Sequence, residues 1–353
     1  MIILAIETSC DDTCVAILEI RSGKLKIRSN VVSSQVKLHA KYGGVYPTLA
    51  KREHQQNLPI ILKRVVKKAD NPKINLIAVT IGPGLEPCLW VGVNFAKELA
   101  EKINSPIVPI NHIEAHILAN FIGGVQGSKT KTQNFPAICL VVSGGHTQLI
   151  LMENFGKYKI LGETRDDAAG ECFDKVARIL GLDYPGGPAI AVEAAKFQIL
   201  NSKFRINLPR PMIYQKNYDF SFSGLKTAVL YNFKNQPLKI RKSKDYIQKM
   251  SAEVQQAVID VLIYKTIKAA KNYKAKTIIL GGGVTANQEL RKQFKRKVEK
   301  EIPGTKYLLP DIKFSTDNAV MIALTAYFNY LKEGIKKWKE IEADANLRID
   351  EKI

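Results

Sequence analysis

Two of the five histidines in this 353-residue chain stand four positions apart, in the segment Pro-Ile-Asn-His-Ile-Glu-Ala-His at 109–116. On a helix this spacing is a little more than one turn, so His112 and His116 project from the same face. One helix can then give two nitrogen ligands to a metal and leave positions for a carboxylate and a substrate. Taken alone, such a pair is more often two surface histidines, so the rest of the chain must decide.

A carboxylate for this site is available in Phe-Ser-Thr-Asp-Asn at 314–318, just before a helix expected over 318–331. Asp317 is a good helix N-cap, and capping alone would explain it. It would also complete a set of two histidines and one carboxylate, which suits iron(II) or zinc acting as a Lewis acid. Glu114 does not indicate a peptidase, because it lies about 200° round the helix from His112, whereas the glutamate of HExxH directly follows the first histidine.

Three loops have the composition of phosphate-binding segments. Residues 7–13 place small hydroxylic residues and two aspartates, Asp11 and Asp12, in a turn between strands, although turns favour aspartate in any case. The turn Ser-Gly-Gly-His at 143–146 permits close approach of a ligand to the backbone. Residues 281–287 lead a buried strand through three glycines into a helix. Neither GxGxxG nor a Walker pattern is present, so no Rossmann or P-loop protein is indicated.

Two further segments are rich in polar groups. Residues 162–175 open a helix with five carboxylates, of which Asp166, Asp167 and Glu171 could simply complement the helix dipole. Asp174 is followed by Tyr-Pro-Gly-Gly-Pro at 184–188, which we expect to be a rigid loop that a ligand can approach closely.

The elements around these segments predict an α/β protein with mixed sheets. Strands at 2–7 and 14–20 form one hairpin, and strands at 137–142 and 147–152 form a second of the same design, which indicates an internal duplication. Helices are expected at 59–69, 91–102, 168–180, 246–272 and 288–299, and further strands at 76–81, 107–110 and 277–280.

Length and composition limit the class of protein. We expect a first lobe over residues 1–128, with residues 318–353 packing back on it, a linker near 123–134, and a second lobe over 129–317. A net charge of +20 favours polyanionic partners, although a lysine-rich genome would give the same excess. No membrane span or signal peptide is evident, and five scattered cysteines fit a reducing cytoplasm.

Taken together, these segments resemble the tRNA N6-adenosine threonylcarbamoyltransferase family, in its bacterial branch, once mislabelled as O-sialoglycoprotein endopeptidase. The resemblance covers nearly the whole chain, through the motifs at 6–11, 37–45, 82–85, 112–116, 142–149, 166–175, 184–188, 219–226, 281–287 and 315–318.

The resemblance implies an actin/Hsp70/sugar-kinase-like fold of two duplicated α/β lobes with a nucleotide cleft between them. It also implies metal-assisted transfer of threonylcarbamoyl from threonylcarbamoyl-adenylate to the N6 amine of the adenosine 3′ of the anticodon, in tRNAs that read ANN codons, with release of AMP. Carried over by motif, His112, His116 and Asp317 would hold one divalent metal, iron(II) or zinc, and Asp11 would orient or deprotonate the amine. The adenylate would be bound by Val141, Val142, Ser143, Gly144, Gly145, Asp174, Gly187 and Asn287.

The resemblance further implies a cytoplasmic enzyme that works on tRNA with a paralogous inactive subunit and a small ATPase, away from membranes. The chain departs from the usual pattern in three places: Thr48 replaces a glutamate, the segment Glu86–Cys88 is bulkier than usual, and Ala191 replaces an aspartate that contacts substrate. The alternatives are an ATPase or phosphotransferase of the same superfamily, a metallopeptidase, and a non-catalytic scaffold that binds tRNA or proteins.

Overall fold

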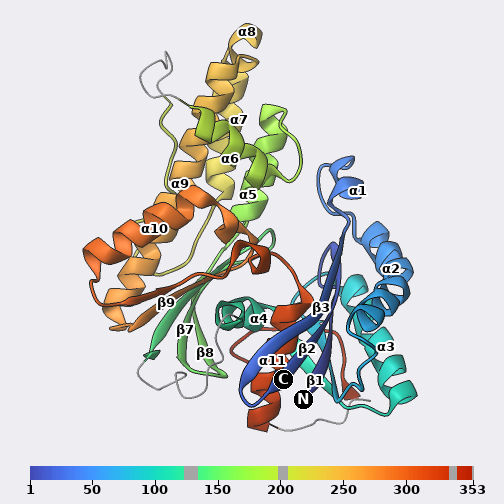
Figure 1. Ribbon diagram of the computed structural model, residues 1–353. Helices are drawn as coiled ribbons and strands as arrows, with labels where there is room; N and C mark the ends of the chain where they lie inside the picture. The colour runs from blue at the N-terminus through green and yellow to red at the C-terminus, as the bar shows by residue number, and fades with distance from the viewer. Residues whose placement is uncertain (123–133, 198–205, 334–339, 352–353) are drawn as a thin grey trace. The chain divides into compact units, whose positions relative to one another are not determined.

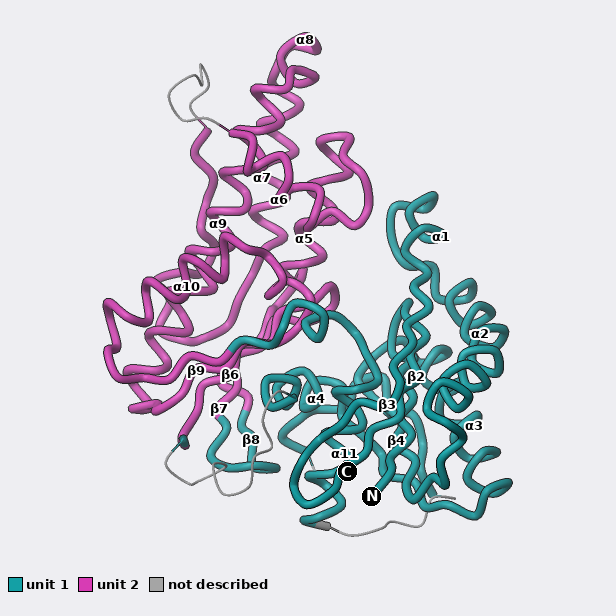
Figure 2. The backbone as a smooth tube through the Cα atoms, in the orientation of Figure 1, with its two compact units in different colours: residues 1–134, 152–159, 309–353 teal, residues 135–151, 160–308 magenta. Residues whose placement is uncertain are grey.

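The computed structural model describes residues 1–122, 134–197, 206–333 and 340–351 (Figure 1). The chain forms two compact units (Figure 2). Unit 1 comprises residues 1–134, 152–159 and 309–353, and unit 2 comprises residues 135–151 and 160–308. The boundary expected at 128/129 lies outside the described residues, and the one expected at 317/318 stays a prediction.

Unit 1 is built on a five-stranded mixed sheet of order β3-β2-β1-β4-β5. Its first three strands are antiparallel, and β4 and β5 continue from β1 in parallel. The strands are β1 (Ile2–Glu7), β2 (Asp12–Arg21), β3 (Lys24–Ser34), β4 (Leu76–Gly82) and β5 (Ile107–Asn111).

Helices cover both faces of this sheet, so its central strands are apolar on both sides. Ile3 and Ala5 of β1 face a cluster that includes α11, whereas Leu4 and Ile6 face the cluster formed with α2 and α3. The helices of unit 1 are α1 (Val36–Ala40), α2 (Pro47–Lys68), α3 (Glu86–Ile103), α4 (His112–Leu118) and α11 (Ala319–Glu333).

The helix expected to begin at residue 59 begins at Pro47 instead, so the predicted start was wrong. Pro47 occupies the first turn, where no backbone N–H is needed. Pro59 lies within the helix on its exposed side, where water can satisfy the carbonyl that proline leaves without a donor.

Unit 2 repeats the strand order of unit 1. Its sheet has the order β10-β9-β6-β7-β8. Read from β8, these are the third, second, first, fourth and fifth strands of the unit, which is the order found in unit 1. The strands are β6 (Ala137–Val142), β7 (Thr147–Asn154), β8 (Lys157–Glu163), β9 (Thr277–Gly281) and β10 (Lys306–Leu308). The predicted duplication is therefore confirmed.

In the described part of unit 2, six α-helices accompany this sheet: α5 (Ala169–Leu180), α6 (Gly186–Lys196), α7 (Ser223–Asn235), α8 (Leu238–Arg241), α9 (Lys244–Asn272) and α10 (Gln288–Glu301). The expected loop at 184–188 is a loop only as far as Pro185, because Pro185 is the N-cap of α6 and Gly186 begins that helix. None of the described helices combines the length and apolar character that a membrane crossing requires.

Candidate active site

The two histidines are positioned by the junction of β5 and α4. Asn111 ends the strand, and its Oδ1 accepts hydrogen bonds from the backbone N–H groups of Ile113 at 2.9 Å and Glu114 at 3.2 Å. This cap starts the helix at His112 and places His112 and His116 on one face, with both side chains buried. The prediction of a shared helical face is confirmed.

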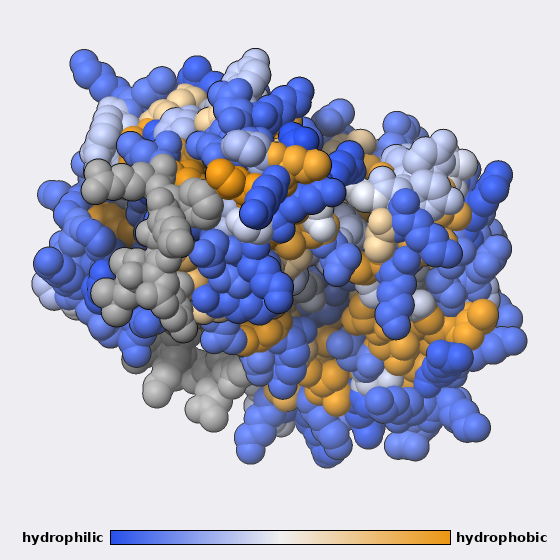
Figure 3. Space-filling view, turned by 90° about the horizontal axis from the view of Figure 1, so that it is seen from above, coloured by the Kyte–Doolittle hydropathy of each residue, from blue (hydrophilic) through white to orange (hydrophobic). Residues whose placement is uncertain are grey.

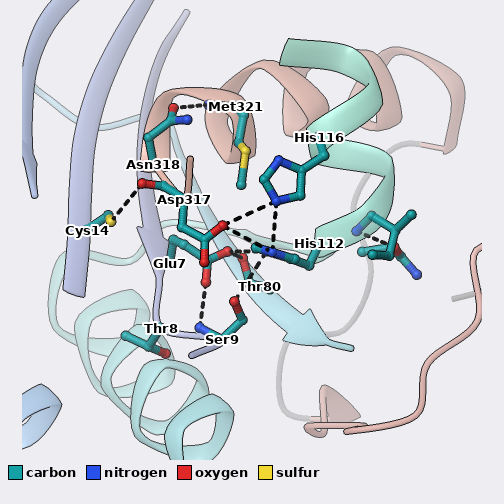
Figure 4. A network of polar contacts seen from close by, with 12 residues as sticks. Glu7, Thr8, Ser9, Cys14, Thr80, His112, His116, Asp317, Asn318 and Met321 are labelled. Atoms are coloured by element: carbon teal, nitrogen blue, oxygen red, sulfur yellow. Dashed lines mark hydrogen bonds and ion pairs between the residues drawn. The ribbon is translucent and has the colours of Figure 1, made fainter. Parts of the chain in front are cut away.

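Asp317 completes a cluster with the two imidazoles (Figure 4). Its Oδ1 lies 3.4 Å from His112 Nε2 and 3.2 Å from His116 Nε2, and the two Nε2 atoms are 3.1 Å apart. Ligands bound at roughly 2.0–2.2 Å to one metal are about 3.0–3.5 Å from one another. The spacing and the donor types therefore both fit a divalent cation among these three atoms.

Glu7, which the sequence interpretation did not select, orients the first histidine. Its Oε2 lies 2.9 Å from His112 Nδ1 and also accepts a hydrogen bond from Thr80 Oγ1 at 2.6 Å, while Oε1 accepts from the backbone N–H of Ser9. A proton held on Nδ1 by this carboxylate leaves the lone pair of Nε2 directed at Asp317 and His116. The available signal was an acidic residue at the end of an otherwise apolar strand.

The charges of this cluster favour a cation at its centre. Burial lowers the pKa of His112, but the charges of Glu7 and Asp317 outweigh burial and raise this pKa to about 10. Burial raises the pKa of Asp317, but the two histidines bring it well below its usual value. The pKa of His116 is lowered, chiefly by burial. The carboxylates thus stabilise one positive charge here, either a proton on His112 or a metal ion.

Glu114 points away from the cluster, as its place on the helix predicted. Its Oε2 accepts a hydrogen bond from Asn329 Nδ2 of α11 at 3.1 Å. The carboxylate that a metallopeptidase would need is therefore engaged elsewhere.

Replacing Glu7 with glutamine is expected to weaken metal binding by about 10- to 100-fold, since residues that orient a ligand typically contribute this much. The amide cannot accept from His112, Thr80 and the Ser9 N–H all at once, because one of its two ends is a donor. Competition with a chromophoric chelator measures the affinity. Glu19→Gln is the control, because Glu19 lies at the other end of the β1–β2 pair and pairs with Arg28; equal affinities in the two variants would contradict the assignment.

Two partly buried aspartates follow β1, Asp11 in the loop before β2 and Asp12 as the first residue of β2. Burial and the charge of Asp317 raise the pKa of Asp11, and the same two causes raise the pKa of Asp12 to about 7. Carboxyl groups with raised pKa are suited to accept a proton near neutral pH. Asp12 is thus a second candidate base beside Asp11, indicated by two adjacent acids after a buried strand.

In unit 2, the predicted turn at 143–146 is present and held by hydrogen bonds. The N–H of Ser143 donates to His146 O at 2.8 Å, and Ser143 O accepts from the N–H of Gly170 at 3.2 Å. Gly144 and Gly145 are exposed and have no positive φ, and a Cβ atom on either would meet nothing within 4 Å. The fold itself therefore does not require glycine at these two positions, whereas close approach of a ligand would.

The other predicted contact residues of unit 2 are connected through α5. Gly170 reaches the turn at Ser143, and Asp174 Oδ1 accepts from the N–H of Gly186 at 2.7 Å. A Cβ atom on Gly187 would meet only Phe173, at 3.9 Å, so this glycine also has room beside it.

Asn287 has a structural role of its own. Its Oδ1 caps α10 by accepting from Leu290 N at 2.9 Å, and its Nδ2 donates to Gln255 Oε1 at 2.7 Å. Val141 and Val142 are buried in β6 and could offer a ligand only their backbone.

Asp166 complements a different helix from the one expected. Its carboxylate accepts from the N–H groups of Phe222 and Ser223, at 2.8 and 3.2 Å, and from the hydroxyls of Ser221 and Ser223, at 2.6 and 2.7 Å. It therefore caps α7, which follows in the chain by more than fifty residues, rather than α5. Asp167 instead pairs with Lys175 at 2.6 Å.

Asp166→Ala is expected to destabilise the protein by about 1–2 kcal/mol, as loss of a helix cap does. Burial raises the pKa of Asp166, but the hydrogen bonds from Ser221 and Ser223 outweigh burial and lower this pKa below its usual value. The folded pKa thus lies below the unfolded one, so this stabilisation is present above about pH 4 and is lost as the pH falls through the folded pKa. Urea unfolding at pH 7 and pH 3 measures it. Glu193→Ala, which removes only the exposed pair with Lys196, should change stability little.

The two units, each built on a five-stranded mixed sheet with the same strand order, have the actin/Hsp70/sugar-kinase-like fold. A solved structure, HypF of T. kodakarensis, shows this fold: it superimposes with a TM-score of 0.58 at 12% identity, over 95% of this chain and 48% of that chain.

Residues 26–324 match the tRNA N6-adenosine threonylcarbamoyltransferase family. The curated enzyme of that name from Thermosipho africanus is 47% identical over 353 residues, covering 99% of this chain and 100% of the relative. The one from Syntrophomonas wolfei is 46% identical, covering 93% of this chain and 92% of the relative. The chain therefore belongs to the tRNA N6-adenosine threonylcarbamoyltransferase family and is an enzyme of tRNA threonylcarbamoylation.

Proposed function

We propose that the protein transfers the threonylcarbamoyl group of threonylcarbamoyl-adenylate to the N6 amine of the adenosine 3′ of the anticodon, in tRNAs that read ANN codons, and releases AMP. The observation that carries this proposal is the convergence of His112, His116 and Asp317 to within 3.4 Å of one another in a family that acts on tRNA.

The chemistry of the residues supports this reaction. The exocyclic amine of adenine is a weak nucleophile, so the carbamoyl carbonyl must be polarised as the bond to AMP breaks. A divalent metal on the two histidines and Asp317 would supply a Lewis acid for a carbonyl or phosphate oxygen. In unit 2, backbone N–H groups of the turn at 143–146 would bind the phosphate, and Gly144, Gly145 and Gly187 would let the adenylate approach the backbone.

The aspartates that follow β1 would carry out the proton transfer. As the new N–C bond forms, the amine must lose a proton, and Asp11 or Asp12 would accept it. The raised pKa that burial gives both carboxyls makes each a better base than an exposed aspartate.

We propose iron(II) as the metal, with zinc as the alternative, since both accept two imidazoles and one carboxylate. We also propose that a paralogous subunit without the metal ligands and a small ATPase assist the enzyme, in the cytoplasm.

The test is transfer of labelled threonine to unmodified tRNA by purified protein supplied with metal and preformed threonylcarbamoyl-adenylate, with and without these two partner subunits. We expect labelled tRNA and stoichiometric AMP. Turnover of ATP without tRNA, together with no transfer even with partners present, would favour the ATPase or phosphotransferase instead, and tRNA binding without either reaction would favour a scaffold.

A further inference from the structure

Unit 1 carries an exposed pair of aromatic rings outside the candidate active site. Tyr42 is 60% exposed and Tyr46 is 56% exposed, and their rings are stacked with centroids 5.9 Å apart and planes 27° apart. They lie between α1 and α2, in the 37–45 motif and next to it. Large rings held together in solvent bury little surface, so folding alone does not explain them.

The surrounding segment is basic without any acidic residue. Residues 35–52 contain four cations and no aspartate or glutamate, and all four cations are exposed: Lys37, Lys41, Lys51 and Arg52. Within the described part of the chain none of the four forms an ion pair. Much of the face in Figure 3 is hydrophilic, so a polar surface by itself singles out no region. The combination of unpaired cations with stacked rings is what distinguishes this segment.

The backbone that carries the second ring is held by a buried imidazole. His39 is fully buried; its Nδ1 accepts a hydrogen bond from the N–H of Tyr46 at 3.3 Å, and its Nε2 lies 3.1 Å from Gln35 Oε1. Gly43 makes the turn between the tyrosines with φ +66°. A surface fixed in this way loses little conformational entropy when a ligand binds.

The same segment is attached to the candidate active site. The N–H of Gln35 donates to Asp11 O at 3.1 Å, and His54 Nε2 of α2 lies 3.0 Å from Cys10 O. Gln35 at the start of the basic segment, and His54 just beyond its end, are therefore joined to the loop between β1 and β2, which carries Asp11 and adjoins Asp12.

We propose that Tyr42 and Tyr46 are a stacking platform for an unpaired base of the tRNA anticodon loop, and that the four cations contact the flanking phosphates. This proposal rests on the proposed function, which supplies an RNA substrate. Aromatic rings beside unpaired cations are the means by which proteins bind single-stranded RNA, since any base can stack and the phosphates are always charged. An acidic protein surface would use the cations but would leave the stacked rings without a role.

The experiment compares Y42A/Y46A with Y42F/Y46F in the full-length protein. Fluorescence anisotropy measures binding of an unmodified anticodon stem-loop and of an RNA duplex of the same length without a loop. We expect Y42A/Y46A to bind the stem-loop about tenfold or more weakly, with duplex binding unchanged, and Y42F/Y46F to bind as the wild type does. Tyr231→Ala is the matched control, because Tyr231 is 62% exposed but lies on α7.

Equal stem-loop binding by Y42A/Y46A and the wild type would overturn the proposal. The proposal would also be overturned if Y42A/Y46A bound RNA as the wild type does but no longer associated with a partner subunit, because the surface would then dock a protein. Tyrosine-dependent binding by a wild-type protein that transfers no threonylcarbamoyl would support the platform and contradict the proposed reaction. The stacking platform and the proposed reaction can therefore be contradicted independently of each other.

Discussion

Replacing His116 with alanine is expected to weaken metal binding by at least about a hundredfold, and to reduce threonylcarbamoyl transfer to background. A residue that only orients a ligand histidine, as Glu7 does, typically contributes about 10- to 100-fold to metal affinity. His116 Nε2 lies 3.1 Å from His112 Nε2 and 3.2 Å from Asp317 Oδ1, so its loss removes one of the three converging donors. Metal content after dialysis and single-turnover transfer measure the two effects.

Glu114→Gln is the matched control for this variant. Glu114 is buried on the same helix, but its carboxylate accepts from Asn329 and not from the cluster, and a glutamine can still accept that bond. We expect wild-type metal content and transfer in this control. Full metal content in His116→Ala would show that the metal, if one binds, is held elsewhere.

Replacing Gly145 with alanine is expected to weaken AMP binding by about tenfold or more while the free energy of unfolding changes by less than about 0.5 kcal/mol. A Cβ atom at this position meets no protein atom within 4 Å, and the residue does not need a positive φ. Any effect must therefore come from a ligand that approaches the backbone. Calorimetric titration with AMP and urea unfolding separate the two quantities.

Gly282→Ala should lower the free energy of unfolding strongly, in contrast to Gly145→Ala. Gly282 has φ +88°, and a Cβ atom there would clash with the backbone oxygen of Val142, so we expect a loss of about 2 kcal/mol or more in the free energy of unfolding. A Gly145→Ala protein that is as unstable as Gly282→Ala would mean that the turn is structural and would remove the argument for a ligand there.

The sequence alone predicted most of the fold, because its signals are local. The apolar strands at 2–7 and 137–142 and the helix after residue 318 are set by burial patterns within a few residues, and each is confirmed. The three glycine or hydroxylic loops lie at strand ends, as the alternation of elements requires. Elements with weaker patterns, such as β3, β8 and α7, were not predicted, since their residues are only partly buried and lack a clear period.

The helical spacing of His112 and His116 was likewise readable from the sequence, because 3.6 residues per turn places such a pair on one face of any helix. The sequence also suggested Asp317 as the third ligand; what only the tertiary structure decided is that Asp317 reaches both histidines and that Glu7 joins them. Asp317 follows them by about two hundred residues and Glu7 precedes them by about one hundred, yet α11 packs on the sheet whose strands β1 and β5 carry Glu7 and the start of α4. No local pattern encodes such contacts; packing of a helix against a sheet does, and it also sets the charges that raise the pKa of His112.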